Sequence, residues 1–290
     1  MYKIYEINEN DKYYPKNLLK VKTHPKKLYV IGNKKILNNK SVAIVGSRDN
    51  SSYGEYYAKK FSKEISSEGI TIISGLAIGI DTIAHENSFN QIGKTIAVIG
   101  SGLNNIYPKI NENLVGKIIE NGGAVISEFE PDVEANLSKF PKRNRIIAGM
   151  SECVIVVEAK FRSGSSITAT QALKNDKKVF CIPGRIGDKR GVGTNNLIKK
   201  GANLLTDVNQ ILNLFEIEKT VPNETKIKIS KQYKDIYKLV EKYELNINEI
   251  SHKLNINIAE LNMKLTMMEL ENLIEINPGG LIKLKKYKKE

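Results

Sequence analysis

The sequence has 290 residues, enough for one large α/β domain and a small one, and its 41% hydrophobic and 27% charged residues are ordinary for a globular protein. No apolar run approaches the roughly 20 residues that cross a bilayer, and the first residues lack a signal-peptide core, so we expect a cytoplasmic protein without a membrane span. The formal net charge of +13 indicates a polyanionic partner or surface. Lysine abundance in an Asn- and Ile-rich chain is also a background bias, so the placement of its six arginines is the better signal.

The first 40 residues differ in character from those that follow. Residues 1–40 are polar and rich in Lys and Asn, with one short apolar piece at residues 28–31. They are too short to bury a core of their own, so we expect an arm that packs on the next domain. That domain begins at Ser41, where a regular alternation of apolar runs and helix-length segments starts.

Residues 41–214 contain short apolar runs, rich in β-branched residues, that predict strands. These runs are residues 42–45, 70–73, 95–99, 124–126, 153–157, 178–182 and 203–205. Nearly continuous apolar character is typical of a parallel sheet covered on both faces. In the first segment between them, Tyr57, Phe61 and Ile65 recur every four residues, which predicts a helix with one buried stripe. The alternation predicts an α/β fold with a Rossmann-like, doubly wound, mostly parallel sheet.

In a doubly wound sheet the ligand site lies beyond the carboxyl ends of the strands. Gly- and Ser-rich turns follow the predicted strands at residues 46–48, 74–81, 100–103, 163–166 and 183–185. Small residues there let backbone N–H groups approach an anion at helix N-termini. Arg48 adds a guanidinium to the same rim. Lys94 precedes its strand, so we expect it at the opposite end of the sheet unless the turn places it at the rim.

The stretch Phe140-Pro141-Lys142-Arg143-Asn144-Arg145 combines an aromatic ring, a rigid Pro and three cations, and it leads into apolar residues. A flat ring can stack on a base while guanidinium groups bind phosphate oxygens. The alternative is a helix start with a core Phe and a solvated basic turn. The stretch alone does not separate these two interpretations.

Other common sites are absent from the sequence or poorly supported. The turn after the first strand lacks the G-x-G-x-x-G pattern and no Walker A sequence occurs, so we expect no nucleotide cofactor. The three histidines are scattered, and Cys153 and Cys181 lie in apolar runs, which favours buried reduced thiols over a metal site. Asp81 and His85 could mimic an acid–base pair, but we favour a helix-capping Asp81 and an internally packed His85.

The last 76 residues follow a second pattern. Residues 215–230 lose the alternation and carry a Pro, which predicts a linker. Predicted helices at residues 233–243, 247–254 and 258–270 precede a predicted hairpin at residues 273–284, so residues 231–290 are expected to form a small winged-helix domain. Its third helix is the one that would read DNA. The third presents Glu260, Asn262, Lys264, Glu269 and Glu271, a poor surface for a phosphate-lined groove.

Several stretches, in this order, resemble the DprA/Smf (DNA processing protein A) family. They are VAIVGSR, SGLAIGIDTIAH, GKTIAVIGSGLNNIYP, ISEF, FPKRNRIIAG, VIVVEA, SGSSITATQAL, PGR and LIKKGANLL, and the resemblance covers about residues 15–215. The resemblance implies a non-enzymatic protein that binds single-stranded DNA, forms a homodimer and loads RecA recombinase onto that DNA in natural transformation. Two departures are Ile78, where many relatives carry Arg or Ser, and the stretch before Ser41, which we expect to be too short for the helical domain found in many members.

Position by position, the resemblance implies a DNA pocket. It assigns to this pocket Arg48, Lys94, Phe140, Lys142, Arg143, Arg145, Ser163, Gly164 and Ser165. Phe140 is the stacking aromatic residue, and the turn that holds Gly164 and Ser165 resembles a backbone phosphate cradle. An alternative function is a nucleotide-processing or nucleotide-sensing enzyme of related fold, in which Glu128 and Glu158 would orient the arginines or bind ribose.

Overall fold

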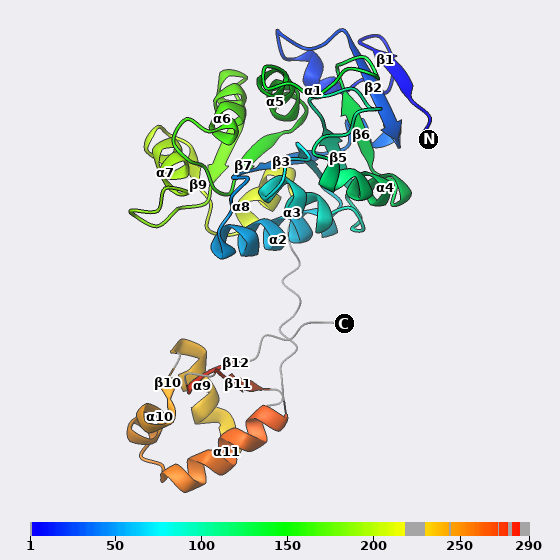
Figure 1. The fold of residues 1–290 in the computed structure, drawn as a ribbon. Coiled ribbons are helices and arrows are strands. Elements are labelled where there is room, and N and C mark those ends of the chain that lie inside the picture. The colour runs from blue at the N-terminus through cyan, green and yellow to red at the C-terminus, as the bar shows by residue number, and fades with distance from the viewer. Residues whose placement is uncertain (1, 218–229, 244, 272, 278–279, 285–290) are drawn as a thin grey trace. The chain divides into compact units, whose positions relative to one another are not determined.

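The apolar runs after Ser41 form parallel strands of one sheet in the computed structural model, which describes residues 2–217, 230–243, 245–271, 273–277 and 280–284 (Figure 1). These strands are β3 (Ser41–Val45), β4 (Thr71–Ser74), β5 (Thr95–Val98), β6 (Ala124–Ser127), β7 (Cys153–Val156), β8 (Lys178–Cys181) and β9 (Asn203–Leu204). Their ends lie within one residue of the predicted ends. Contacts divide the chain into two units, Met1–Lys219 and Thr220–Glu290.

The strand order places a switch point next to β3. The order across the sheet is β1-β2-β6-β5-β4-β3-β7-β8-β9. From β3 the chain therefore winds outward through β4, β5 and β6, then returns to the other side of β3 to form β7. The loops that follow β3 and β7 diverge to opposite faces, which opens a crevice between them. The predicted doubly wound, mostly parallel sheet is confirmed.

Residues 1–40 contribute more than an arm, because two of their segments are strands of the same sheet. β1 (Tyr5–Asn8) pairs with β2 (Lys27–Gly32), and β2 pairs with β6, both antiparallel. The predicted apolar piece is the centre of β2, whose residues 28–31 are buried. Because β2 covers the edge of β6, these residues lose their exposure by joining the sheet and not by packing on it.

Helices cover both faces of the sheet (Figure 1). One face carries α2 (Ser52–Ser67), α3 (Ile80–Glu86), α4 (Glu112–Glu120) and α8 (Asn209–Leu212). The other carries α1 (Lys16–Leu19), α5 (Lys139–Met150), α6 (Gly164–Lys174) and α7 (Val192–Lys199). Short 3-10 turns lie at Lys34–Asn38, Lys109–Asn111, Asn213–Phe215 and Lys231–Tyr233. The predicted stripe on α2 is confirmed, since Phe61 and Ile65 are buried and Tyr57 packs against the same core.

The first unit contains both cysteines and the start of the predicted linker. Cys153 and Cys181 are buried free thiols, as predicted. Phe215, at the start of the predicted linker, is buried in the core beside α8, and residues 218–229 of that linker lie outside the described part of the chain. Among the described residues, no helix is long and apolar enough to cross a membrane.

The second unit has its own small core. It contains α9 (Lys234–Lys242), α10 (Ile247–Leu254) and α11 (Ile258–Leu270), with β10 (Leu245–Asn246), β11 (Ile274–Ile276) and β12 (Leu281–Leu284). The strands form an antiparallel sheet in the order β10-β12-β11. These bounds agree with the predicted helices and hairpin, while residues 278–279 of the hairpin tip lie outside the described residues. The element order is typical of a winged helix, and that assignment stays a prediction.

Candidate nucleic-acid interface

A cavity of about 410 Å³ opens at the switch point, where β3 and β7 end side by side. Its lining combines the loops after β3, β4 and β7 with residues of α3, α5 and α6. The lining residues are Val45, Gly46, Ser47, Arg48, Asp49, Ala77, Asp81, Phe140, Arg143, Asn144, Ile147, Lys160, Ser163, Gly164, Ser165 and Thr168. The predicted rim at the carboxyl ends of the strands is therefore a real concavity, which we call the switch-point cavity.

Arg48 and Phe140 come from distant parts of the chain and meet at this cavity. The guanidinium carbon of Arg48 lies 5.4 Å from the centroid of the Phe140 ring. Arg48 is exposed, and its guanidinium forms no ion pair with any residue that the structure describes. The backbone close to Arg48 is held by Gly79, whose φ of 82° and close approach to the Ser47 carbonyl oxygen leave no space for a Cβ. The cation and the ring are thus positioned and available to a ligand.

The N-terminus of α6 forms the opposite wall. Ser163 is the N-cap, and its hydroxyl oxygen accepts a hydrogen bond from the Ser166 backbone N–H at 3.4 Å. No atom lies within 4 Å of where a Gly164 Cβ would be, so the backbone is open on that side. The Asn144 side chain donates to the Gly164 carbonyl oxygen at 3.2 Å and ties this turn to α5. An anion at this wall would meet N–H groups and the positive end of the helix dipole.

Arg143 lies in the wall but acts differently from a free phosphate-binding side chain. Only 5% of it is exposed, and its guanidinium donates to the carbonyl oxygens of Gly75 and Val98 and, at 3.0 Å, to Asn144 Oδ1. Burial lowers the pKa of Arg143 to about 10, an effect that the nearby Asp81 carboxylate opposes. Burial raises the pKa of Asp81, and the Arg143 charge opposes this shift in turn. Arg143 therefore braces the ends of β4 and β5 against α5.

Three of the residues assigned by resemblance are not brought into the cavity. Arg145 lies two residues from Arg143, about 200° around α5, and its guanidinium donates to the Thr23 carbonyl oxygen and pairs with Glu128. Lys142 is exposed on α5 but does not line the cavity. Lys94 directly precedes β5, at the end of the sheet opposite to the cavity. The expectation that Arg145 faces the ligand with Arg48 and Phe140 is wrong, because the helix turns it toward the N-terminal residues.

The rim also carries an ionic network that was not predicted from the sequence. Asp49 accepts a hydrogen bond from Lys160 Nζ at 3.3 Å and lies 3.5 Å from an Arg190 guanidinium nitrogen. The Lys160 hydrogen bond and the Arg190 charge lower the pKa of Asp49. Lys160 follows β7 just as Arg48 follows β3, so the rule that selected Arg48 would also have selected Lys160. Asn144 is a second omission, although it lies within the basic stretch.

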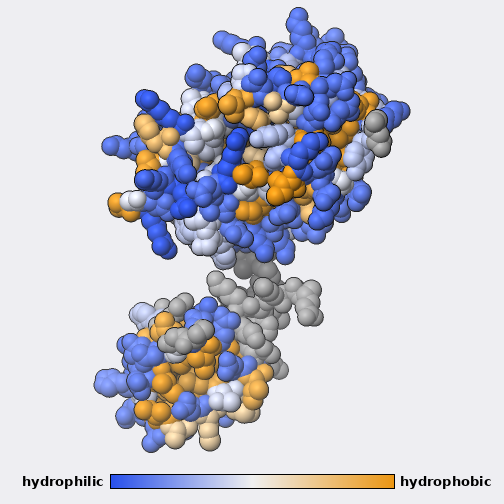
Figure 2. Space-filling view, viewed as in Figure 1, coloured by the Kyte–Doolittle hydropathy of each residue, from blue (hydrophilic) through white to orange (hydrophobic). Residues whose placement is uncertain are grey.

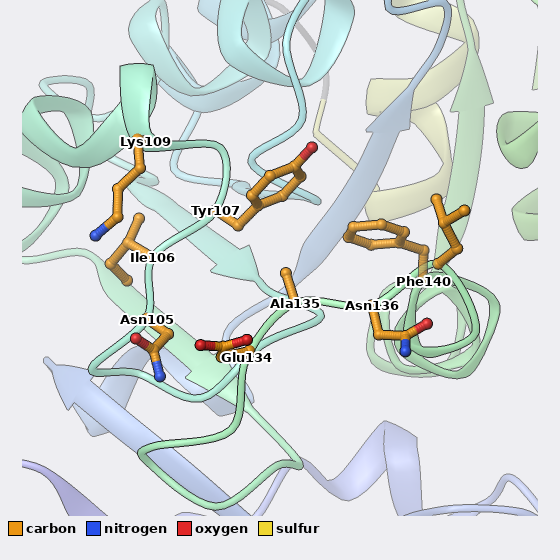
Figure 3. Close-up of a pocket in the computed structure, with 9 residues that line it drawn as sticks. Asn105, Ile106, Tyr107, Lys109, Glu134, Ala135, Asn136 and Phe140 are labelled. Atoms are coloured by element: carbon orange, nitrogen blue, oxygen red, sulfur yellow. The ribbon is translucent and has the colours of Figure 1, made fainter.

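A second groove, of about 370 Å³, borders the cavity and shares Phe140 with it (Figure 3). Its other lining residues are Asn105, Ile106, Tyr107, Lys109, Glu134, Ala135, Asn136 and Leu137. The Tyr107 and Phe140 rings are 5.9 Å apart between centroids and tilted by 35°. Apolar side chains also gather in the middle of the otherwise mainly hydrophilic face of the first unit that Figure 2 shows.

The geometry does not support acid–base chemistry at Asp81 and His85. Gly79, and not Asp81, is the N-cap of α3, which corrects the expected capping role. His85 is buried, and its Nδ1 lies 2.7 Å from Thr95 Oγ1. Thr95 already donates its hydroxyl proton to the Ile72 carbonyl oxygen, so His85 donates from Nδ1. The buried Nε2 has no hydrogen-bond partner among the described residues, which favours the neutral ring. Burial agrees, since it lowers the pKa of His85 to about 3.

The remaining candidate groups are engaged within the protein. Glu158 accepts hydrogen bonds from the backbone and hydroxyl groups of Ser51, at the N-terminus of α2, and Glu128 pairs with Arg145. Neither carboxylate lines the switch-point cavity. Within the described ranges, no group of three or more His, Cys, Asp or Glu side chains could hold a metal ion.

Comparison with known sequences places this arrangement in a family. The family model of DNA recombination-mediator protein A matches residues 6–216. Protein Smf from Escherichia coli is 35% identical over 289 residues, which cover 97% of this chain and 77% of that protein. DNA processing protein DprA from Streptococcus pneumoniae is 44% identical over 206 residues, which cover 71% of this chain and 72% of that protein.

Solved structures give the same result. The X-ray structure of DNA processing protein A from Streptococcus pneumoniae superposes with a TM-score of 0.69 at 41% identity, covering 74% of this chain and 76% of that one. A structure from Helicobacter pylori, which concerns the single-stranded DNA binding mode of its DNA processing protein A, gives a TM-score of 0.67 at 33% identity. It covers 74% of this chain and 96% of the other. The chain belongs to the DNA recombination-mediator protein A family.

Proposed function

We propose that this chain binds single-stranded DNA in the switch-point cavity and delivers it to RecA recombinase during DNA processing in natural transformation. The observation that carries the proposal is the Arg48 guanidinium, 5.4 Å from the Phe140 ring centroid, facing the N-terminus of α6 across one cavity. A cation, a ring and open backbone N–H groups are the parts that a flexible polyanion with unpaired bases requires. Duplex DNA keeps its bases stacked and paired, so it cannot place one on Phe140.

The parts of the cavity divide between phosphate and base. Arg48 can bind phosphate oxygens with its guanidinium fork, and the α6 N-terminus can add backbone hydrogen bonds to a neighbouring phosphate. Phe140 is partly exposed and can stack on one base, a contact worth about 1–3 kcal/mol. Arg143 and Asn144 hold the two walls in place through their contacts with Gly75, Val98 and Gly164.

The proposal is a binding role without a chemical step. Each carboxylate that an enzyme of related fold would use, Glu128 or Glu158, is already engaged in a contact that holds the fold together. His85 is buried and does not line the cavity, and burial lowers its pKa. The Helicobacter pylori relative supports DNA as the ligand. Delivery to RecA and assembly as a homodimer rest on the family resemblance.

The test is binding of a fluorescent oligothymidine by Arg48→Ala and Phe140→Ala. We expect Phe140→Ala to weaken binding about 5- to 100-fold, as the loss of one stacked base implies, and Arg48→Ala to weaken it and reduce its salt dependence. Lys117→Ala is the matched control, because it removes an exposed cation on α4 away from the cavity. The same variants should lose the ability to start RecA filaments on DNA coated with single-strand-binding protein.

Wild-type affinity in both cavity variants would refute the site. Equal weakening by Lys117→Ala would show that general positive charge, and not this cavity, binds the DNA. A cavity variant that binds DNA weakly but still promotes RecA filaments at full efficiency would refute delivery through this site.

A further inference from the structure

We propose that the groove beyond Phe140 is a second nucleotide subsite that takes one unpaired base bearing an exocyclic amino group. The proposal rests on the proposed function, since the base would belong to the strand that Arg48 holds by its phosphates. The groove residues Tyr107, Leu137 and Glu134 carry this assignment, and none of them lines the switch-point cavity.

The groove continues the switch-point cavity. Phe140 lines both, and a smaller cavity of about 60 Å³ shares Arg48 and Phe140 with the switch-point cavity and Tyr107 and Phe140 with the groove. The Phe140 ring lies between the other two groups. Its centroid is 5.4 Å from the Arg48 guanidinium carbon and 5.9 Å from the centroid of the Tyr107 ring. A strand with one base on Phe140 therefore has its next base beside the groove.

The walls of the groove suit a flat apolar ring. Tyr107 is 48% exposed and Leu137 is 80% exposed, although both are large hydrophobic side chains. Figure 3 shows the Tyr107 and Phe140 rings on one side of the groove and Asn105 and Glu134 on the other. A base between these sides would cover Tyr107 and Leu137, and the removal of their apolar surface from water favours binding.

The charges of the groove exclude a phosphate group. Lys109 is the single cation among the lining residues, and it lies 3.9 Å from the Glu112 carboxylate. Glu134 contributes a negative charge, and its carboxylate forms no ion pair with the residues that the structure describes. The cavity around Arg48 thus fits a phosphate, while the groove fits the base.

The polar groups left for a ligand select among bases. The Asn105 amide nitrogen donates to the Asp132 carbonyl oxygen at 2.7 Å, which leaves the Asn105 amide oxygen as an acceptor. The Glu134 carboxylate also accepts hydrogen bonds only. The Asn136 amide oxygen accepts a hydrogen bond from the Ser138 backbone N–H at 3.0 Å, which leaves the Asn136 amide nitrogen as a donor. Two acceptors and one donor match cytosine or adenine, whose amino group lies beside a ring-nitrogen acceptor, whereas thymine offers no amino group. The subsite should therefore prefer an amino-bearing base.

The experiment compares short oligodeoxycytidine and oligothymidine of equal length in wild type and variants. Wild type should bind oligodeoxycytidine about tenfold more tightly, the effect of one hydrogen bond to a charged acceptor, and Glu134→Gln should remove that preference. Tyr107→Ala and Leu137→Ser should weaken binding of both strands about 5- to 100-fold, whereas Tyr107→Phe should keep the wild-type affinity. Ile110→Ser is the matched control, because Ile110 is 79% exposed nearby but does not line the groove.

The outcomes separate this proposal from the proposed function. If Arg48→Ala weakens binding while Tyr107→Ala and Leu137→Ser behave like Ile110→Ser, the groove is not a subsite and the proposed function stands. If Arg48→Ala binds both strands as wild type does, the proposed function itself fails. An unchanged cytosine-to-thymine ratio in Glu134→Gln overturns the selection of an amino-bearing base.

Discussion

Three arginines near the cavity have three different roles, and their surroundings decide which. Arg48 is exposed and without an ion pair among the described residues, so its charge is available to a ligand. Arg143 is buried and satisfied by carbonyl oxygens, and Arg145 is paired with Glu128 on the other side of α5. A guanidinium that already has strong partners must lose them before it binds phosphate. We therefore expect Arg48 to be the principal anion-binding side chain of the site.

At the residue scale, we expect Asp49→Asn to strengthen DNA binding. Asp49 places a negative charge on the cavity wall and pairs with Lys160 at 3.3 Å and Arg190 at 3.5 Å. Its removal frees both cations and should raise oligothymidine affinity about two- to fivefold at low salt, as expected for an exposed ion pair. Fluorescence anisotropy at several salt concentrations would measure this gain, which should shrink as salt screens the charges.

Glu120→Gln serves as the control for Asp49→Asn, because it removes the same charge from an exposed position on α4. It should leave the affinity close to that of wild type. A lower affinity in Asp49→Asn would show instead that Asp49 holds Lys160 and Arg190 in the geometry that DNA requires.

At the scale of elements, α5 joins the cavity to the N-terminal residues. One side of the helix carries Phe140, Arg143 and Asn144 toward the cavity. The other side carries Arg145 toward Thr23 and packs against α1. The position of Phe140 therefore depends on how closely α5 can approach α1.

We expect Gly149→Ala to destabilise the first unit by forcing α5 away from α1. The added Cβ would lie 2.6 Å from Leu18 Cδ1, and Leu18 is fully buried and cannot swing into solvent. Overpacking of this kind costs about 1–3 kcal/mol, which urea unfolding followed by circular dichroism would measure.

Gly116→Ala, in α4, is the matched control for Gly149→Ala. Its Cβ would meet only the Tyr2 hydroxyl at 3.2 Å and the Glu120 side chain at 4.0 Å. The greater helix propensity of Ala should leave this variant unchanged or more stable by up to about 1 kcal/mol. Equal stability changes in the two variants would contradict a specific contact between α1 and α5.

At the scale of the whole molecule, the two units have separate cores and different surfaces. The second unit exposes Met263, Met267 and Leu270 on α11, and Lys264 pairs with Glu260 at 2.6 Å. In a winged helix this element would enter the major groove, where cations and hydrogen-bonding side chains are needed. Its composition suits DNA reading poorly.

We therefore expect a chain that ends at Ser230 to bind oligothymidine with the affinity of the full chain. The cavity and the groove are built wholly from residues before 169, and the first unit keeps all of its core. Side-by-side anisotropy titrations of the two proteins would measure the difference. A large loss of affinity on truncation would mean that the second unit contributes directly to binding.

The sequence by itself determined the sheet and the place of the site. Each parallel strand is a short apolar run that is visible in the local sequence. Its position in the chain can therefore be predicted without knowing which strands it pairs with. The carboxyl ends of parallel strands share one edge, which is why Arg48, Ser163, Gly164 and Ser165 could be assigned to a common rim before their distances were known. Phe140 was assigned to the same rim because it lies in the basic stretch and because of the family resemblance.

Only the tertiary structure decided which side chains of that rim face a ligand. Arg143 and Arg145 are two residues apart and similar in sequence context. The packing of α5 against α1 and the sheet nevertheless places Arg143 in the wall of the switch-point cavity and Arg145 next to Glu128. The strand β2 and the groove at Tyr107 likewise depend on segments distant in sequence. Such contacts follow from how helices and strands pack together, and a local pattern does not contain that information because many partners could satisfy the same apolar face.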